Sequence, residues 1–252
     1  MSERLPGGNA AGAIRIGDTV RREAGPWTPT IHALLHHLET KGFQGVPRAM
    51  GVDEEGREVL SYLHGDTVGD RLPWPTWTHD DATLEQVGRW LRSYHDAVAD
   101  FVPPIGATWR FGGSWEAGLI IANNDAAPYN AVWHDGLVGF IDWDLAAPAS
   151  RAWDLAFVAF SWVPLVARSV ATREGFEDFD ARPTRLRRLL AAYGYEADQT
   201  AFVDLVRQRA RASADGIRSL AAAGDALCIR LLQQGVANDV DRAVDELGSF
   251  EL

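Results

Sequence analysis

The sequence feature that most constrains the fold is a His-Asp-Gly turn at residues 134–136, which joins two short apolar runs near the middle of the chain. Asp-Gly between apolar runs is a strong signal for a β-hairpin, because Gly tolerates the positive φ that a tight turn requires. The pattern therefore predicts paired strands at residues 131–134 and 137–141.

Three polar residues flank this predicted hairpin. Asp125 and Asn130 precede the first strand, and Asp142 follows the second. A hairpin brings the start of its first strand beside the end of its second, so we expect the three side chains to face one small volume. Hard oxygen ligands suit Mg²⁺, and a carboxylate free of the metal can accept a proton from a hydroxyl. This combination is typical of a phosphoryl-transfer site, where positioning and charge neutralisation supply most of the catalysis.

The spacing Asp-x4-Asn, followed by Ile-Asp-Trp-Asp and then Trp-Asp-Leu-Ala, resembles the aminoglycoside phosphotransferase and choline kinase-like family of small-molecule kinases, relatives of the protein kinases. The resemblance covers nearly the whole chain and is strongest over residues 124–156. It implies that Asp125 is the catalytic base, that Asn130 is a catalytic-loop residue and metal ligand, and that Asp142 is the principal metal-binding acid. Asp154 matches an acid whose role in the family is mainly structural.

The fold that this resemblance implies is an α+β, protein kinase-like bilobal fold. It has a small antiparallel sheet with one helix, followed by a larger, mainly helical lobe that carries the catalytic hairpin. Apolar runs separated by turns predict strands early in the chain, and spacings of three and four predict helices later. We expect the nucleotide-binding lobe at residues 1–64 and the helical lobe, with the catalytic loop and the acceptor-binding region, at residues 65–252.

Two residues of the predicted second strand are candidates for the cation that binds nucleotide phosphates. The family places Lys or Arg at the end of this strand, which favours Arg22, with Arg21 as the alternative. A guanidinium can bridge two phosphate oxygens. In kinases the following helix supplies a Glu that pairs with this cation, but the corresponding residue here is His32. A second departure is Asn123, which stands where the family usually has a His two residues before the base.

Four further residues are expected to contact the nucleotide. Gly7 and Gly8 precede the first strand, and their backbone N–H groups can approach phosphates. Ser61 and Leu63 lie in the predicted hinge, where kinases present backbone groups to the purine. Backbone contacts leave no mark on the sequence, so the sequence does not distinguish ATP from GTP as the donor.

Net charge, apolar runs and cysteine content limit the classes of partner that we expect. A net charge of −11 argues against nucleic acid, which requires a basic footprint. It favours cationic small molecules or serves solubility alone. No apolar run approaches the roughly 20 residues of a membrane span, and the start of the chain lacks the apolar core of a secretory signal. With Cys228 as the single cysteine, we expect a cytoplasmic monomer or weak dimer that does not bind membranes.

Downstream acids and two tryptophans are candidates for contacts with the acceptor. The segment 173–180 contributes four acids that either bind a cationic substrate or form a solvated surface: Glu174, Glu177, Asp178 and Asp180. Trp133 and Trp143 lie close to the predicted site, where their rings would stack on a substrate.

The sequence supports two main functional hypotheses. The first is a small-molecule kinase that uses Mg²⁺ and ATP or GTP to phosphorylate an antibiotic-like, amino-sugar or amino-alcohol hydroxyl. The second is a catalytically impaired kinase-fold protein that acts in binding or in antibiotic or bacteriocin immunity, as the departures at His32 and Asn123 suggest. A purely structural domain would use the acids as turn residues, which leaves their spacing unexplained.

Overall fold

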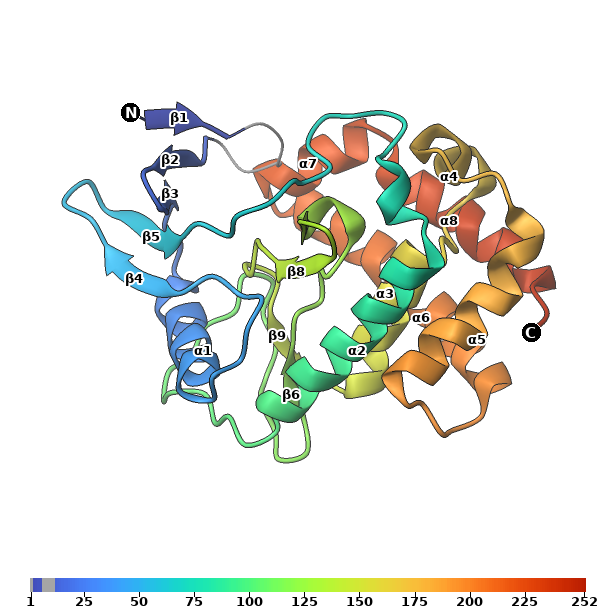
Figure 1. The fold of residues 1–252 in the computed structure, drawn as a ribbon, viewed down its shortest axis with the longest axis horizontal. Helices are drawn as coiled ribbons and strands as arrows, with labels where there is room; N and C mark the ends of the chain where they lie inside the picture. The colour runs from blue at the N-terminus through green and yellow to red at the C-terminus, as the bar shows by residue number, and fades with distance from the viewer. Residues whose placement is uncertain (1, 6–11) are drawn as a thin grey trace. The chain divides into compact units, whose positions relative to one another are not determined.

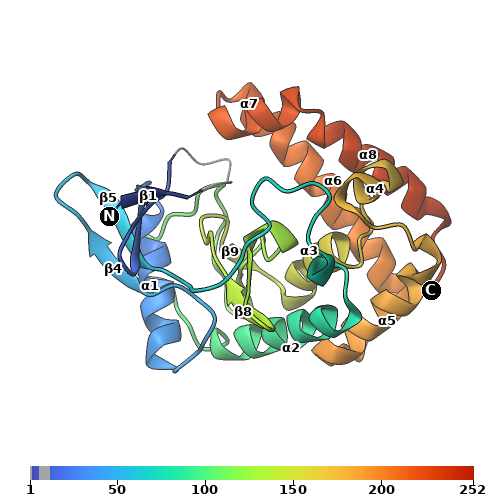
Figure 2. The same ribbon diagram turned by 45° about the horizontal axis from the view of Figure 1, so that its top comes forward.

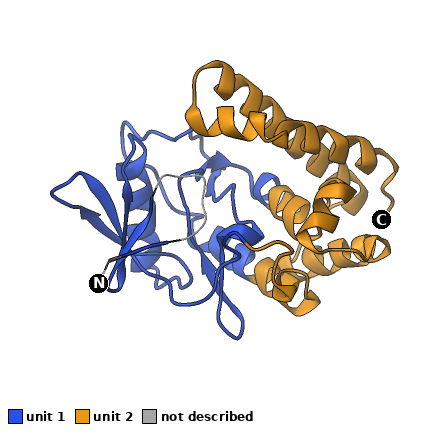
Figure 3. Ribbon diagram, turned by 90° about the horizontal axis from the view of Figure 1, so that it is seen from above, with its two compact units in different colours: residues 1–70, 90–154 blue, residues 71–89, 155–252 orange. Residues whose placement is uncertain are grey.

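The computed structural model describes residues 2–5 and 12–252 and divides into two compact units, each discontinuous in sequence (Figure 3). Unit 1 comprises Met1–Asp70 and Trp90–Asp154, and unit 2 comprises Arg71–Arg89 and Leu155–Leu252. The predicted catalytic and nucleotide-binding residues that the structure describes belong to unit 1. The lobe boundary expected after residue 64 stays a prediction.

Unit 1 begins with a five-stranded antiparallel sheet in the order β1-β2-β3-β5-β4 (Figure 1). Its strands are β1 (Ser2–Arg4), β2 (Ile14–Ile16), β3 (Thr19–Glu23), β4 (Ala49–Val52) and β5 (Arg57–Ser61). The strands β2 to β5 confirm that apolar runs separated by turns predict strands early in the chain. β1 was not expected, because three polar residues carry no apolar alternation. It pairs with β2 and extends the sheet.

Helix α1 (Thr28–Thr40) connects β3 to β4 and packs beside β4 (Figure 1). The apolar stripe expected from spacings of three and four is buried, with its members at most 1% exposed: Ile31, Leu34, Leu35 and Leu38. Burying such a side chain contributes about 1.5–3 kcal/mol. This stripe fixes which face of α1 is buried and therefore where its polar residues lie.

The central hairpin is confirmed as β7 (Ala131–Trp133) paired with β8 (Leu137–Phe140). Asp135 in its turn has a φ of 54°, a conformation that Asp tolerates better than most residues. A second antiparallel pair, β6 (Ile120–Ala122) with β9 (Ala147–Ala149), brackets the hairpin in sequence. This pair was missed, and it ties the chain before the catalytic loop to the chain after it.

The helices beyond α1 form the rest of the molecule. α2 (Asp81–Ala97) and α3 (Arg151–Trp162) cross the boundaries between the units, and the others lie in unit 2: α4 (Arg168–Glu174), α5 (Arg182–Tyr193), α6 (Gln199–Ala222), α7 (Ala226–Gln233) and α8 (Val236–Glu246). Figure 2 shows α7 and α8 alongside α6. Within the described part of the chain, every helix is too short or too polar to span a bilayer. A small antiparallel sheet followed by many helices confirms the expected α+β class.

Candidate active site

The hairpin brings Asn130 and Asp142 to the same end. Ala131 is paired with Phe140 in the β7–β8 register. The next residue, Ile141, donates its backbone N–H to the Asn130 carbonyl oxygen at 2.9 Å. Asp142 follows directly, so a residue before β7 and a residue after β8 are neighbours, as the sequence pattern predicted.

Asp125 lies beside Asn130, and each of its carboxylate oxygens accepts a hydrogen bond from its own loop. Asn130 donates Nδ2–H to Asp125 Oδ2 at 2.7 Å and to the Asp125 carbonyl oxygen at 3.0 Å. The Tyr129 hydroxyl donates to Asp125 Oδ1 at 2.6 Å, and the Tyr129 side chain is 45% exposed. Since the Asn130 amide nitrogen is directed at Asp125, its oxygen is the atom that can ligate a cation.

A buried acid supports this loop from behind. Asp154 is fully buried and accepts backbone hydrogen bonds from Asn123 at 2.9 Å and Asn124 at 2.8 Å. Its Oδ2 also lies 3.0 Å from His95 Nε2 of α2. Asn123 in turn accepts the Asp125 backbone N–H at 3.0 Å through its Oδ1. The asparagine that departs from the family pattern therefore helps to brace the loop, and the contacts of Asp154 fit the structural role expected.

Asp142 is held in an unusual conformation. Its φ of 59° lies in the left-handed region, which costs energy for a residue other than Gly and is concentrated at functional sites. Its side chain is 39% exposed. The next residue, Trp143, is fully buried and donates to the Phe140 carbonyl oxygen at 3.0 Å. The expectation that Trp143 stacks on a substrate is therefore wrong, whereas that for Trp133 stays a prediction.

Arg22 lies at the centre of three carboxylates. Its guanidinium donates to Glu58 at 2.5 Å, to Asp142 at 2.9 Å and to Asp144 at 2.5 Å. Its side chain is 12% exposed. Burial disfavours the charged form of Arg22, but the charges of Asp142, Asp144 and Glu58 outweigh burial and raise its pKa. The neighbouring Arg21 lies 3.6 Å from Asp53 instead, so Arg22 is the strand arginine beside Asp142.

The acid that supports Arg22 comes from a strand. Glu58 of β5 is 1% exposed and divides its oxygens between Arg22 and His32, whose Nε2 lies 3.0 Å from Glu58 Oε1. Burial acts to raise the pKa of Glu58, but the hydrogen bond from His32 and the charge of Arg22 lower it overall. His32 occupies the helix position where the family has an acid.

A second arginine, Arg110, lies at this site and, like Glu58, was not predicted from the sequence. Arg110 donates to Asp144 at 3.1 Å, and its guanidinium lies 4.9 Å from the Trp27 ring centroid. Burial raises the pKa of Asp144, the charge of Arg22 opposes this, and the carboxylates of Asp142 and Glu58 add to it. Asp144 thus joins two cations at the edge of the candidate site.

The residues around Asp142 fit Mg²⁺. Among residues 2–5 and 12–252, no three His, Cys, Asp or Glu side chains converge closely enough to hold a metal ion. Mg²⁺ does not need such a cage, because it is usually bound by one or two carboxylates together with waters and substrate phosphates. The half-exposed Asp142 carboxylate and the Asn130 amide oxygen are donors of this kind.

The other four residues expected to contact the nucleotide stay predictions. Gly7 and Gly8 lie outside the described residues. Ser61 ends β5, and its backbone N–H donates to the Arg48 carbonyl oxygen at 2.9 Å. That N–H is therefore committed to the sheet, and the contacts expected of Ser61 and Leu63 with a purine stay predictions.

The acidic segment of unit 2 is more ordered than a solvated loop. Glu174 ends α4, and its backbone oxygen accepts hydrogen bonds from Trp74 and His79. Burial raises the pKa of Glu174 to about 7. Asp178 accepts the Ala181 backbone N–H and so caps a short 3-10 turn. The side-chain contact of Asp178 supports a structural role for that acid.

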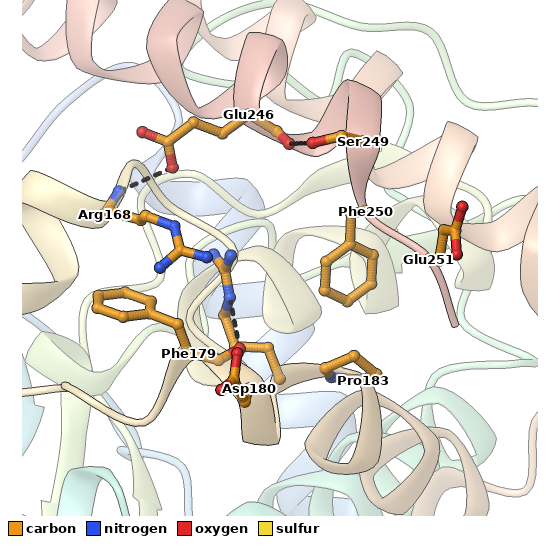
Figure 4. A pocket seen from close by; sticks show the side chains of 9 residues that line it. Arg168, Phe179, Asp180, Pro183, Glu246, Ser249, Phe250 and Glu251 are labelled. Atoms are coloured by element: carbon orange, nitrogen blue, oxygen red, sulfur yellow. Dashed lines mark hydrogen bonds between the residues drawn. The ribbon is translucent and has the colours of Figure 1, made fainter.

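A pocket of about 320 Å³ lies in unit 2 and includes Asp180 of that segment (Figure 4). The guanidinium carbons of Arg168 and Arg182 lie 4.5 Å and 5.2 Å from the Phe179 ring centroid. The lining combines these two arginines with three acids, Asp180, Glu246 and Glu251, so its charge is mixed. The lining residues are Arg168, Phe179, Asp180, Arg182, Pro183, Glu246, Ser249, Phe250 and Glu251.

The chain resembles known proteins in both sequence and fold. No protein-family model matches the chain. It is 38% identical over 207 residues to the trifolitoxin immunity protein of Rhizobium leguminosarum bv. trifolii, an alignment that covers 79% of this chain and 77% of that protein. The chain belongs to the trifolitoxin immunity protein family.

Solved structures define the fold of this family member. The amicoumacin kinase hAmiN, in complex with AMP-PNP, Ca²⁺ and Ami, matches with a TM-score of 0.69 and 10% identity over 99% of this chain and 90% of its own. The GDP complex of aminoglycoside 2′-phosphotransferase-IIIa matches with a TM-score of 0.64 and 13% identity over 98% and 93%. A choline/ethanolamine kinase family protein from Mesorhizobium loti matches with a TM-score of 0.59 and 15% identity over 99% and 88%. The expected protein kinase-like fold is confirmed.

Proposed function

We propose that this protein is a small-molecule kinase that transfers the γ-phosphoryl group of ATP or GTP to a hydroxyl of a small acceptor. The observation that carries the proposal is the meeting of three groups at one end of the hairpin. Asp125 is bonded to Asn130, the Asn130 backbone is bonded to the residue before Asp142, and Asp142 is bonded to Arg22. Such a set suits phosphoryl transfer, which depends on positioning and on charge neutralisation.

Each residue has a role that follows from its chemistry. Asp125 accepts the proton of the acceptor hydroxyl as that oxygen bonds to the γ-phosphorus and the bond to the β-phosphate oxygen breaks, which releases ADP or GDP. Asn130 and Asp142 would hold Mg²⁺, which neutralises phosphate charge. Arg22 binds the phosphates through its guanidinium.

The structural relatives support the acceptor class. They include an amicoumacin kinase, an aminoglycoside phosphotransferase and a choline/ethanolamine kinase family protein. We therefore propose an antibiotic-like, amino-sugar or amino-alcohol acceptor. The name of the sequence relative adds trifolitoxin to this set of candidates.

A second candidate function is immunity by binding, without phosphoryl transfer. It is favoured by the immunity relative and by one feature of the site. Both oxygens of Asp125 already accept hydrogen bonds, and Asp142 is already paired with Arg22. A binding protein has no need to release these contacts, whereas a kinase must release the pair between Arg22 and Asp142 when Mg²⁺ and nucleotide bind.

An acceptor screen separates the two candidates. The purified protein is incubated with Mg²⁺ and ATP or GTP, and with aminoglycosides, macrolides, amicoumacin, choline-like alcohols and trifolitoxin, while ADP or GDP and phosphorylated products are measured by mass spectrometry. A phosphorylated acceptor that disappears with the Asp142→Ala variant supports the kinase. Nucleotide binding without product across the set favours immunity by binding. Absence of nucleotide binding by the wild-type protein overturns the kinase proposal.

A further inference from the structure

The cation of the candidate site has its nearest acid within the same sheet. Arg22 on β3 and Glu58 on β5 are directly opposed in the antiparallel register. Opposed residues of neighbouring strands carry their side chains on one face, about 5 Å apart at Cβ. Arg22 Nε therefore reaches Glu58 Oε2 at 2.5 Å without any contribution from a helix.

The helix contributes a different group to the same cluster. His32 on α1 stands where the family resemblance requires the acid that pairs with the phosphate-binding cation. Its Nε2 lies 3.0 Å from Glu58 Oε1, so the helix is joined to Arg22 through the strand acid. The cluster thus contains the cation and one acid of a kinase ion pair, but the acid has moved from the helix to the strand.

We propose that Glu58 is the positioning residue that holds Arg22 toward the nucleotide phosphates, and that His32 links helix α1 to this strand pair. This inference rests on the proposed kinase function. It assigns to Glu58 the role that the helix acid has in related kinases.

The other two carboxylates are less suited to this role. Asp142 is 39% exposed and is the proposed metal ligand, so it must exchange Arg22 for Mg²⁺ when nucleotide binds. Asp144 is shared with a second cation, Arg110. Glu58 is 1% exposed, and its other partner is the histidine. The pair between Arg22 and Glu58 is therefore the one that can persist while phosphates occupy the remaining guanidinium nitrogens.

The location of the acid has a consequence for regulation. An acid on a helix leaves its cation whenever the helix swings away, whereas an acid on the neighbouring strand is held by the ladder of backbone hydrogen bonds. A displacement of α1 would break the contact between His32 and Glu58 and leave the contact between Glu58 and Arg22 intact. The site is thus assembled independently of the helix position.

The test is a double-mutant cycle on nucleotide affinity, measured by calorimetry with Mg²⁺ and ATP or GTP. We expect Glu58→Gln to weaken binding by about 10- to 100-fold, because it removes a charged hydrogen-bond partner. In an Arg22→Met background the same change should weaken binding less than twofold, since Glu58 acts through Arg22. A purely structural role would give equal losses in both backgrounds and would overturn the proposal.

Two further variants complete the experiment. Asp53→Asn removes an acid beside Arg21 on the same sheet and should leave nucleotide affinity unchanged. The double variant His32→Glu/Glu58→Gln returns the acid to the helix and should regain at least tenfold of the lost affinity. If Glu58→Gln does not fold, this double variant carries the test, and an affinity more than tenfold below wild type overturns the proposal. An affinity of Glu58→Gln within twofold of wild type also overturns it, whereas a wild-type protein that binds no nucleotide overturns the kinase function itself.

Discussion

The two ends of the candidate active site are built in different ways. At the cation end, Arg22 is surrounded by side chains from β5 and from the segment after β8, and every contact is an ion pair. At the base end, Asp125 is bonded to Tyr129 and Asn130, which are neutral donors four and five residues further along the same loop. The cation end is a network of charged residues that are distant in sequence, and the base end is a local turn.

Because of this difference, a ligand must break an existing ion pair at the cation end, whereas at the base end it can approach Asp125 with less rearrangement. A nucleotide must displace Asp142 from Arg22, so binding there is an exchange of ionic partners. An acceptor hydroxyl approaching Oδ1 of Asp125 competes there with the half-exposed Tyr129 phenol. We therefore expect the cation end to govern nucleotide affinity and stability, and the base end to govern turnover alone.

The largest effect is expected at the cation end. Asp142→Ala should lower turnover by about 10⁴-fold or below detection, because it removes the carboxylate proposed to hold Mg²⁺. It should also reduce the dependence of nucleotide affinity on Mg²⁺. Turnover assays and calorimetry with and without the metal check both effects. Turnover within tenfold of wild type would contradict the metal assignment.

At the base end the change should be confined to chemistry. Asp125→Asn keeps the shape of the side chain but removes the proton acceptor, so we expect turnover to fall by about 10²- to 10³-fold. Nucleotide affinity should stay within about twofold, since Asp125 does not contact Arg22. Parallel measurement of kcat and nucleotide Kd tests this split. An equal loss in both quantities would mean that the two ends are not separate.

The cation end should also leave a mark on the dependence of stability on pH. Burial acts to raise the pKa of Glu58, but the hydrogen bond from His32 and the charge of Arg22 lower it below the ordinary 4.5. Its stabilisation is therefore present above pH 4.5 and is lost as the pH falls through the folded-state pKa. At pH 7 the free energy of unfolding of the wild-type protein should exceed that of Glu58→Gln by about 2–3 kcal/mol. Urea unfolding should show a smaller gap at pH 3.5 than at pH 7, and an unchanged gap would exclude Glu58 as the titrating group.

The smallest effect is expected from the phenol at the base end. Tyr129→Phe removes one hydrogen bond to Asp125 and should change turnover by less than about tenfold, with nucleotide affinity unchanged. Acceptor-dependent turnover measures this change, and Tyr195→Phe in unit 2, whose ring packs against Phe202, is the matched control. A loss above 100-fold would show that Tyr129 takes part in proton transfer.

The same contrast explains which features the sequence could predict. The base end follows from local spacing, because Asp125, Tyr129 and Asn130 share one loop and an Asp-Gly turn sets the hairpin register. Fold class, the strands β2 to β5 and the stripe of α1 also follow from apolar runs, turns and local periodicity. The strands β6 and β9 have three residues each, and Pro148 lies within β9, so neither shows a period.

The cation end required the three-dimensional structure. The pairing of Arg22 with Glu58 depends on the register of β3 with β5, and α1 and β4 intervene between these strands in sequence. No local pattern connects residues 36 positions apart. An acid on β5 opposite the arginine becomes a candidate only once that strand order is known. Arg110 comes from an irregular segment, which gives no periodic signal at all.

Gly139 and Gly45 allow two backbone segments beside the candidate site to lie in direct contact. Phe140 of β8 donates its backbone N–H to the Gly45 carbonyl oxygen at 2.9 Å. A Cβ atom on Gly139 would lie 1.9 Å from that oxygen, and one on Gly45 would lie 2.6 Å from the Val138 carbonyl oxygen. The main chain between α1 and β4 is thus pressed directly onto the hairpin, with no side chain as a spacer. Substitutions that retune the chemistry of individual groups in this site can accumulate without altering the separation of the backbones that carry them.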